Sequence, residues 1–477
     1  MNRVSKRTAF ILLTALWIAP AVHGGSKGSA SRPNFLLILL DDSGWTDFGC
    51  YGSRIDTPNI DRLAKQGMRF TDCHSAAPNC SPSRAGLLTG RTPSRSGVYS
   101  YLPPEHVMHL PASEITVAEI LKKQGYATGH FGKWHVTNLD SDQPQPKDHG
   151  FDYSLGTDNN ASPSHKDPVN FIRNGTAVGR MAGYSCQLVV DETSGWLRQR
   201  ERIGDQQPWL SCVWFHEPHT PIASPPELIE KYRKKFPSLN RKQAAYYANI
   251  ENVDRAVGRL LESLSKLGES ENTFVFLTSD NGPLNEFSKV GLRGKKSHVW
   301  EGGHRVPGIF RWPGKIKAGS TNTAPIGGVD FLPTVCAITG APLPDDRVID
   351  GTSILPLLRG QSFKRERPLF WFFYRVEPAA ALRVGDWVIV AHMDDNKRKK
   401  THPLTAPDMP AIKRDGLTGF ELYNLNRDLK QTSELGAIEA ERFNRLKKRL
   451  IAYHREVVEQ GPYWEIPESY GKQKTRK

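Results

Sequence analysis

The stretch NFLLILLDD, residues 34–42, decides the fold class. Six apolar side chains follow Asn34 without interruption and end at two aspartates. An apolar run of this length, bounded by polar residues, is typical of a parallel strand buried on both faces of a sheet. Three other stretches have the same form: YATGHFGKWH (126–135), WLSCVWFHEPH (209–219) and TFVFLTSDNG (273–282). The sequence therefore predicts an α/β fold with several buried parallel strands.

Helical patterns lie between these strands. Residues 113–124, SEITVAEILKKQ, begin with a serine that can cap a helix, and residues 243–267 place apolar side chains at helical spacing. Strands alternating with helices predict a doubly wound sheet with helices on both faces. Ligands of such sheets bind beyond the carboxyl ends of the strands. We therefore expect the polar residues at the four strand ends to form one site.

The last part of the chain has a different pattern. Residues 369–392 alternate as antiparallel strands do, and residues 440–460 indicate an amphipathic helix. We expect a catalytic domain over residues 32–367 and a smaller C-terminal α/β domain over residues 368–477.

The first residues indicate export. Arg3, Lys6 and Arg7 precede the apolar run 9–22, and small residues follow near Gly24. This pattern predicts a signal peptide over residues 1–24. A membrane anchor and a buried N-terminal helix are the alternatives, but the run is short for a bilayer and no later segment is long enough to span one. We expect a secreted or periplasmic protein, or a lysosomal or extracellular one in a eukaryotic host.

Charge and cysteine content limit the binding partners and the cysteine-based sites that can be expected. The formal net charge is +14 over 477 residues, which favours sulfated or uronic polysaccharides over nucleic acid as partners of an exported protein, although simple solubility explains the charge equally well. The six cysteines form no CxxC pair, so neither a zinc site nor a disulfide framework is indicated. If Cys80 stays unpaired, at most two disulfides can form.

Oxygen ligands follow two of the strands. Asp41 and Asp42 end one strand, and Asp280 and Asn281 end another. Three carboxylates and an amide suit a hard divalent cation, with calcium favoured where ligands are many. The alternative is that each pair caps a following helix or turn.

Cations and imidazoles follow the other strands. Five such residues are expected near one another: Arg84, Lys133, His135, His219 and Lys296. Like charges in a poorly hydrated site repel strongly, so the cluster predicts a bound anion such as a tetrahedral dianion or monoester. The alternatives are zinc bound by His216 and His219, or ordinary hydrogen-bonded histidines.

Cys80 lies in CSPSRAGLLTGR, residues 80–91, at the expected start of a helix. Pro82 suits the first turn, and Arg84 follows one turn after the cysteine. A helix N-terminus can bind an anion or lower the pKa of a thiol, which makes a cysteine-dependent phosphatase one candidate. The phosphatase loop, however, separates cysteine and arginine by five residues, and here there are three. A buried, inert cysteine is the other alternative.

The segment 80–91 resembles the signature of type I, formylglycine-dependent sulfatases, in which cysteine, any residue, proline, any residue and arginine direct oxidation of the cysteine. Other blocks are similar to this family in the family's order: PNFLLILLDDSGW (33–45), GYATGHFGKWH (125–135), HEPHTP (216–221), TSDNG (278–282) and KKSHVWEGGHRVPGIFRWPG (295–314). The resemblance extends from Arg32 to about Leu435. It implies the alkaline-phosphatase-like fold: a mixed sheet between helices with a smaller C-terminal domain.

The resemblance also implies a mechanism. Cys80 would become formylglycine, an aldehyde whose hydrate attacks sulfur with one hydroxyl and helps to expel sulfate with the other. It assigns five residues to calcium: Asp41, Asp42, Cys80, Asp280 and Asn281. Asp280 is also a candidate acceptor of the proton from the attacking hydroxyl.

The remaining roles implied by the resemblance concern sulfate. Arg84 would hold the hydrate and the carboxylates, and Lys133 and Lys296 would bind sulfate oxygens. Lys296 is preferred to Lys295 because it lies five residues before the EGG motif. His219 would protonate the leaving oxygen, and His135 would be the base in sulfate elimination. Asn160 falls near a polar sulfate ligand of some members.

Two blocks depart from the family pattern. Ser297, His298 and Val299 replace small residues and threonines, and the segment after His135 lacks the usual glycine. These departures concern which substrate the protein accepts. Neither of them removes a catalytic group. In the second domain, Tyr374, Arg375, His392 and the run NKRKK (396–400) are expected near an anionic glycan, with a solvated loop as the alternative for that run.

These observations predict a secreted, calcium-dependent sulfatase acting on sulfated carbohydrates, with galactose or N-acetylgalactosamine sulfates as first candidates. Its partners would be the glycan and a formylglycine-generating or equivalent maturation enzyme. A phosphodiesterase or phosphonate monoester hydrolase of the same superfamily is one alternative. A non-catalytic polyanion-binding protein is the other.

Overall fold

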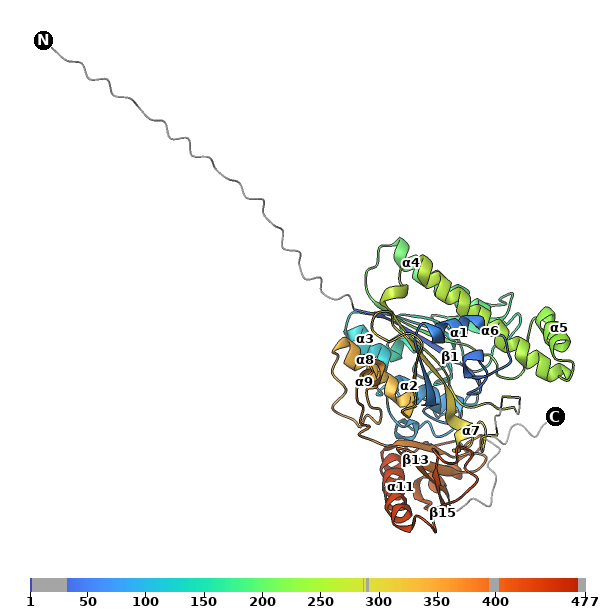
Figure 1. Cartoon of the computed structure of the whole chain (residues 1–477), viewed down its shortest axis with the longest axis vertical. Helices are drawn as coiled ribbons and strands as arrows, with labels where there is room; N and C mark the ends of the chain where they lie inside the picture. The colour runs from blue at the N-terminus through green and yellow to red at the C-terminus, as the bar shows by residue number, and fades with distance from the viewer. Residues whose placement is uncertain (2–31, 286, 289–290, 394–402, 471–477) are drawn as a thin grey trace. The chain divides into compact units, whose positions relative to one another are not determined.

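The predicted strand at the start of the fold, β1 (Asn34–Leu40), lies inside an 11-stranded mixed sheet (Figure 1). The structure is a computed structural model that describes residues 1, 32–285, 287–288, 291–393 and 403–470. Apart from Met1, the expected signal peptide lies outside the described residues, and so does the run 396–400.

The order of the large sheet is β10-β2-β9-β8-β1-β7-β3-β4-β5-β6, with β11 paired to β2. Parallel pairing joins β1 to both β7 and β8, and β3 to both β7 and β4. The bounds of the other strands are β2 Met68–His74, β3 Ala127–Lys133, β4 Tyr153–Thr157, β5 Phe171–Arg173, β6 Thr176–Gly179, β7 Trp209–Trp214, β8 Thr273–Ser279, β9 Arg305–Arg311, β10 Ser320–Asn322 and β11 Ile326–Gly327. The four strands predicted from apolar runs are therefore neighbours with a common direction.

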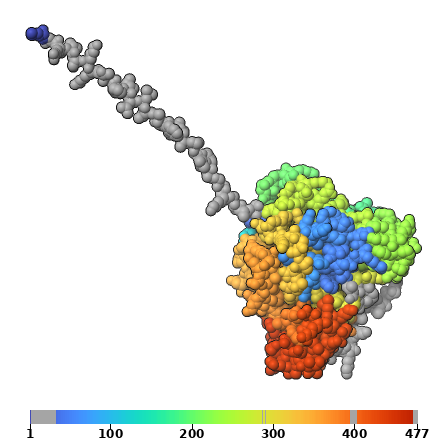
Figure 2. All heavy atoms as spheres, viewed as in Figure 1, coloured from blue at the N-terminus to red at the C-terminus, as the bar shows by residue number. Residues whose placement is uncertain are grey.

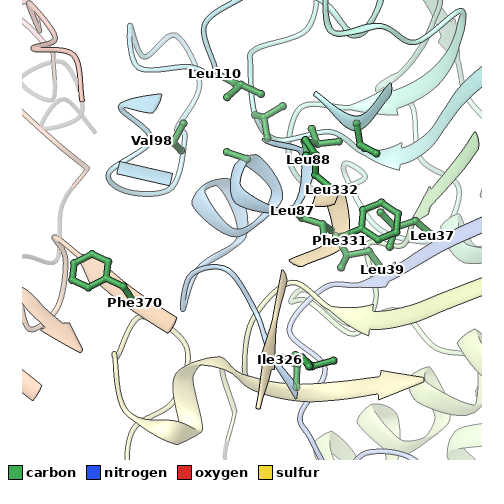
Figure 3. Packing of buried hydrophobic residues seen from close by; sticks show 14 of the residues in the cluster. Leu37, Leu39, Leu87, Leu88, Val98, Leu110, Ile326, Phe331, Leu332 and Phe370 are labelled. Atoms are coloured by element: carbon green, nitrogen blue, oxygen red, sulfur yellow. The ribbon is translucent and has the colours of Figure 1, made fainter. Parts of the chain in front are cut away.

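Both faces of β1 are buried, which explains its uninterrupted apolar sequence. Phe35, Leu37 and Leu39 belong to one hydrophobic cluster, and the alternate residues Leu36, Ile38 and Leu40 belong to another. Figure 3 shows Leu37 and Leu39 among side chains of the first cluster. Because successive side chains of a strand point to opposite faces, a strand between two helical layers needs apolar residues at every position.

Helices cover both faces of the large sheet. One layer contains α1 (Pro58–Lys65), α4 (Ser185–Arg202), α5 (Pro226–Lys235) and α6 (Arg241–Lys266), and the other contains α2 (Cys80–Thr89), α3 (Val117–Lys123), α8 (Phe331–Thr339) and α9 (Leu355–Leu358). The short helix α7 (Glu301–His304) precedes β9. The mixed sheet between helices confirms the predicted fold class.

The predicted start of the helix at residues 113–124 is wrong. Helix α3 begins at Val117, where the Thr116 side chain accepts from the Glu119 amide and the Glu119 carboxylate accepts from the Thr116 amide. This reciprocal capping box satisfies two backbone donors and outweighs a lone serine. Ser113 lies instead in a turn, with the amide of Glu114 donating to Pro111.

The C-terminal residues form a second, antiparallel sheet of order β12-β13-β14-β15. Its strands are β12 Leu369–Phe373, β13 Ala379–Val384, β14 Trp387–Met393 and β15 Leu417–Asn424, and its helices are α10 Asp408–Arg414 and α11 Ala440–Gln460. Helix α11 has the bounds that the sequence predicted. These residues, orange to red in Figure 2, lie against the rest of the unit 33–477. The boundary between residues 367 and 368 remains a proposal.

One side chain of β12 connects the second sheet to the first part of the chain. The Trp371 indole donates to the carbonyl oxygen of Ser75 at 2.9 Å, and its ring stacks on His304 with centroids 3.9 Å apart. Ser75 precedes α2 by five residues. The C-terminal sheet is therefore fixed close to the segment that leads into Cys80.

All six cysteines lie in the described residues and are free, so none of the disulfides allowed by the sequence is formed. Among the helices of the described ranges, none has the length and apolar composition needed to cross a bilayer.

Candidate active site

The ends of β1 and β8 bring the predicted oxygen ligands together. The two strands run parallel in register, with Leu40 opposite Ser279, so the residues that follow each strand leave the sheet side by side. The Asp42 amide donates to Asp280 Oδ1 at 3.2 Å, and Asn281 Nδ2 donates to Asp42 Oδ1 at 2.7 Å. The four residues form one contiguous group beyond the sheet edge, as the sequence predicted.

Three oxygens of this group are buried without a hydrogen-bond partner among the described residues: Asp41 Oδ1, Asp42 Oδ2 and Asn281 Oδ1. Burial and the negative charge of Asp41 raise the pKa of Asp280 to about 8, against the opposing effect of Arg84. Both observations, the buried acceptors without donors and the raised pKa of Asp280, indicate that this group of residues lacks positive charge. The set therefore fits a hard divalent cation such as calcium.

Residues outside the predicted set fix the conformation of Asp42. Its φ is +65°, which is uncommon for a residue with a side chain. The amide of Ser43 donates to Ser279 Oγ at 3.0 Å, and Asp47 Oδ2 accepts from the Gly44 amide at 2.6 Å and from the Tyr246 hydroxyl at 2.5 Å. These contacts hold the turn after β1 and orient Asp42.

Cys80 is the first residue of α2 and is buried. Pro82 lies in the first turn, as predicted, where its missing N–H leaves no helical bond unmade. Sγ of Cys80 lies 3.3 Å from Oδ1 of Asn79, and Nδ2 of Asn79 donates to Ser297 Oγ at 2.9 Å. Asn79 was not predicted as a site residue; it is the N-cap residue of α2, but its side chain makes no capping bond to the helix and contacts Cys80 and Ser297 instead.

Arg84 binds two parts of the site from one turn further along α2. Its Nε and one terminal nitrogen donate to Asp280 Oδ2 at 3.0 and 2.6 Å, and the other terminal nitrogen donates to the carbonyl oxygen of Lys133 at 2.7 Å. The side chain is completely buried. A buried guanidinium is stable only with such partners, so Arg84 and Asp280 depend on each other.

Two buried lysines bind the two aspartates that end β1. Nζ of Lys133 lies 2.5 Å from Asp41 Oδ2, and Nζ of Lys296 lies 2.5 Å from Asp42 Oδ1. Burial works to lower the pKa of Lys296, but Asp42 and the other negative groups raise it above its ordinary value. Each lysine occupies one oxygen of its carboxylate and leaves the other oxygen bare.

His219 and Asn160 share one partner. His219 Nδ1 lies 2.6 Å from the carbonyl oxygen of Thr220, and Asn160 Nδ2 donates to the same oxygen at 3.1 Å. Because a carbonyl only accepts, Nδ1 carries the proton and Nε2 is directed to Asp42 Oδ2, 3.6 Å away. Burial and the charge of Lys296 lower the pKa of His219 to about 4.

The two other histidines have separate partners. His135 Nε2 lies 2.8 Å from the carbonyl oxygen of Leu102, and burial together with Lys133 holds the pKa of His135 well below its ordinary value. His216 Nε2 lies 2.8 Å from Thr157 Oγ1. His216 and His219 therefore bind different groups, and the geometry gives no support to a zinc pair.

A second group of potential metal ligands lies outside the predicted site and consists of His74, Glu301 and His304. Nδ1 of His74 lies 2.9 Å from Nδ1 of His304, and His304 Nε2 lies 3.0 Å from the Val299 carbonyl oxygen. His74 Nε2 lies 2.7 Å from Asp72 Oδ1 and 2.9 Å from a terminal nitrogen of Arg383. Because a carboxylate only accepts, His74 Nε2 carries a proton and donates it to Asp72. Every ring nitrogen of these two histidines therefore has a partner within the chain.

Comparison with known proteins agrees with this geometry. The family described as Sulfatase matches residues 33–341, which is more than half of the chain. A second family, described as N-sulphoglucosamine sulphohydrolase, C-terminal, matches residues 293–399.

Among curated relatives, N-acetylgalactosamine-6-sulfatase of Canis lupus familiaris is 34% identical over 425 residues, covering 81% of this chain and 76% of the relative. Steryl-sulfatase of Rattus norvegicus is 36% identical over 430 residues, covering 72% and 73%. Among solved structures, that of Ps i-CgsB in complex with k-i-k-neocarrahexaose has a TM-score of 0.77 at 25% identity, covering 92% of this chain and 96% of that one. The chain therefore belongs to the sulfatase family and is a sulfuric ester hydrolase with an alkaline-phosphatase-like fold.

Proposed function

We propose that this chain is an exported, calcium-dependent sulfatase that hydrolyses sulfate esters of carbohydrates through a formylglycine at position 80. One observation supports this proposal most directly. Three bare, buried oxygens of Asp41, Asp42 and Asn281 lie beside two buried lysines in a site that also contains Cys80 and Arg84. Buried oxygens without a partner are suited to bind a metal ion, and the lysines beside them are suited to bind an anion.

The oxygens of Asp41, Asp42, Asp280 and Asn281 would hold calcium, with residue 80 completing the ligand set. Calcium would supply positive charge to the reacting group and to the crowded carboxylates. The chain contributes the orientation of these ligands: Arg84 fixes Asp280, and the turn held by Asp47 fixes Asp42.

Position 80 lies at the N-terminus of α2, where the backbone N–H groups favour a negative charge. A formylglycine hydrate would supply both the nucleophilic hydroxyl and the second hydroxyl needed for sulfate release. Asp280 is a candidate acceptor of the proton from the attacking hydroxyl, because Arg84 holds its carboxylate in the site.

Four side chains would act on the sulfate group. Lys133 and Lys296 would bind its oxygens and offset the charge that develops as the S–O bond breaks. His219, with Nδ1 protonated and Nε2 directed into the site, would give a proton to the leaving oxygen once substrate charge stabilises its cationic form. His135 would be the base in sulfate elimination, through the Nδ1 that has no partner among the described residues.

A carbohydrate substrate is supported by the relatives and by charge. A matched relative is called N-acetylgalactosamine-6-sulfatase, and a similar structure contains a neocarrahexaose. The net charge of +14 favours a polyanionic substrate. We therefore propose galactose or N-acetylgalactosamine sulfates, with Asn160 near the sulfate. A maturation enzyme that acts on Cys80 is the implied partner, and the N-terminal segment supports a secreted or periplasmic location.

The first test is mass spectrometry of the peptide that contains residue 80, from a host that matures a control sulfatase. It is paired with sulfate release from an aryl sulfate, with calcium present or removed. We expect loss of the thiol mass, gain of the aldehyde mass and calcium-dependent sulfate release. An unmodified cysteine without release contradicts the proposal and favours a polyanion-binding protein. Faster cleavage of a phosphodiester or phosphonate monoester identifies the other hydrolase class.

A further inference from the structure

The side chain of Asn79 lies between residue 80 and the segment that contains Lys296. The thiol of Cys80 donates to Asn79 Oδ1 at 3.3 Å, and Asn79 Nδ2 donates to Ser297 Oγ at 2.9 Å. Asn79, Cys80 and Ser297 are all buried. Ser297 directly follows Lys296, whose Nζ binds Asp42 in the site. Asn79 therefore connects the proposed nucleophile to the segment of a proposed sulfate ligand.

The side-chain oxygen of Asn79 does not serve the helix that it precedes. An N-cap side chain usually accepts from the second or third amide of its helix, but Asn79 makes no such bond. The third residue of α2 is Pro82, which has no N–H to donate. The oxygen is therefore left for another donor, and it accepts from the side chain of residue 80.

Ser297 is held beside Asn79 by its backbone as well as by its hydroxyl. Its amide donates to the carbonyl oxygen of Pro78 at 2.7 Å, and its hydroxyl accepts from Asn79. Its φ is +73°, which is uncommon for a residue with a side chain. Ser297 is one of the residues that depart from the family pattern. In the structure it holds the amide of Asn79 with Oδ1 directed to residue 80.

The group that faces this oxygen would change when Cys80 is oxidised. A thiol can donate one hydrogen bond. The aldehyde of formylglycine has only a carbonyl oxygen, which accepts, whereas its hydrate has two hydroxyls that donate. A buried acceptor that loses its donor raises the free energy of the folded chain. Asn79 Oδ1 should therefore favour the hydrate over the aldehyde.

We infer that Asn79, held by Ser297, is a positioning residue that accepts a hydrogen bond from one hydroxyl of the hydrate at position 80 and shifts the equilibrium from aldehyde to hydrate. Hydration consumes one water: the C=O double bond becomes single, the water oxygen bonds to carbon, and one water proton moves to the former carbonyl oxygen. A hydroxyl that donates to Asn79 cannot donate to Asp280 at the same time. Asn79 thus also determines which hydroxyl is left for Asp280. This inference rests on the proposed function and deepens it by naming a residue that keeps the nucleophile in its reactive form.

The test measures the ratio of hydrate to aldehyde at position 80 in the matured full chain, with calcium removed because the ion would also favour the hydrate. Labelling cysteine with carbon-13 at Cβ gives separate NMR signals for the aldehyde carbon, the hydrate carbon and the remaining thiol carbons. The rate of trapping by methoxyamine, which reacts with the aldehyde, reports the same ratio when one signal is weak. Asn79→Leu is close in shape but has no acceptor, so it should lower the ratio by about fivefold to tenfold.

Matched variants separate the acceptor from other effects of substitution. Asn79→Asp keeps an oxygen at this position and should keep the ratio at least as high as in the parent. Ser297→Ala removes the partner that holds the amide and should lower the ratio less than Asn79→Leu. Asn426→Leu makes the same exchange at an exposed turn and should leave the ratio unchanged. If Asn79→Leu does not fold or mature, Ser297→Ala replaces it, because it leaves residues 79–84 intact.

The outcomes separate this inference from the proposed function. An unchanged ratio in Asn79→Leu and Ser297→Ala, with residue 80 converted, overturns the inference and leaves the proposed function standing. An equal fall in Asn426→Leu also overturns it. An unmodified cysteine in the parent protein, detected by mass spectrometry, overturns the proposed function itself. Conversion without sulfate release, with the shift in ratio intact, overturns the proposed reaction and leaves the role of Asn79 standing.

Discussion

Asn160 and His219 donate to one and the same acceptor, the carbonyl oxygen of Thr220, at 3.1 and 2.6 Å. This shared bond fixes the tautomer of His219, because Nδ1 must carry the proton. It also gives Asn160 a second possible role, as a support for the proposed acid, besides its proposed place near the sulfate. The position of Nε2 thus depends on a residue far from His219 in sequence.

Asn160→Ala is therefore expected to lower kcat by about tenfold, through poorer alignment of the proposed acid. Steady-state kinetics with two aryl sulfates of different leaving-group pKa measures this effect. The loss should be larger for the poorer leaving group, because that group needs protonation more. An equal loss with both substrates would contradict a role through His219 and favour direct contact with sulfate. Asn426→Ala, at an exposed turn, is the matched control.

Calcium should stabilise the folded chain. Calcium at 100 times its dissociation constant adds about 2.7 kcal/mol to the free energy of unfolding. Thermal unfolding with and without calcium measures this gain, which Asp42→Asn and Asn281→Ala should reduce. Asp254→Asn is the control, because this buried carboxylate accepts from the amides of Asn59 and Ile60, away from the site. A gain that persists in Asp42→Asn would place the ion elsewhere.

Arg84 should be essential for stability as well as for activity. Arg84→Ala removes both of the Arg84 donors to Asp280 Oδ2, and losing one partner of a buried ion pair costs about 3–5 kcal/mol. Urea unfolding in calcium buffer measures the change. Arg455→Ala, whose side chain is exposed, should change the free energy of unfolding by less than about 0.5 kcal/mol. Similar values for both variants would show that Arg84 is not held as its bonds imply.

His454 should make the fold sensitive to acid. Burial lowers the pKa of this α11 histidine to about 4, and its ring packs against Phe372. Below pH 6.5, His454 takes up a proton in the unfolded chain. In the folded chain it stays neutral until the pH falls to about 4. Stability from this residue is therefore complete above pH 6.5 and falls as the pH drops towards 4, by about 3 kcal/mol in total.

The variant His454→Phe should remove this part of the pH dependence. Urea unfolding from pH 7 to pH 4 compares it with the parent, and other buried histidines cancel because both proteins contain them. Parallel curves for the two proteins would contradict the assignment.

The strand ends could be predicted because two simple signals coincide there. An uninterrupted apolar run marks a strand buried on both faces, and the polar residues after it can only lie at the sheet edge. Asp41, Asp42, Asp280 and Asn281 were found in this way, and the contacts between them follow from the register of β1 and β8. The start of α3 was missed because Thr116 and Glu119 form a capping box that competes with Ser113.

Other contacts in the site cannot be recognised from the pattern of side chains in the sequence. The acceptors for His219 and His135 are the backbone carbonyl oxygens of Thr220 and Leu102, and any residue type supplies a carbonyl. The stacking of Arg375 on Tyr101 depends on how the second sheet packs against the first part of the chain. Such tertiary contacts follow from the fold as a whole and cannot be obtained from local spacing.

The burial of Cys80 limits when its side chain can be modified. Its side chain is 3% exposed, at the start of a helix whose residues are all buried. An enzyme cannot reach position 80, the proposed site of modification, once α2 has packed against the sheet. The proposed oxidation of the thiol would therefore have to come before folding, and a chain that folds first would keep an unmodified cysteine.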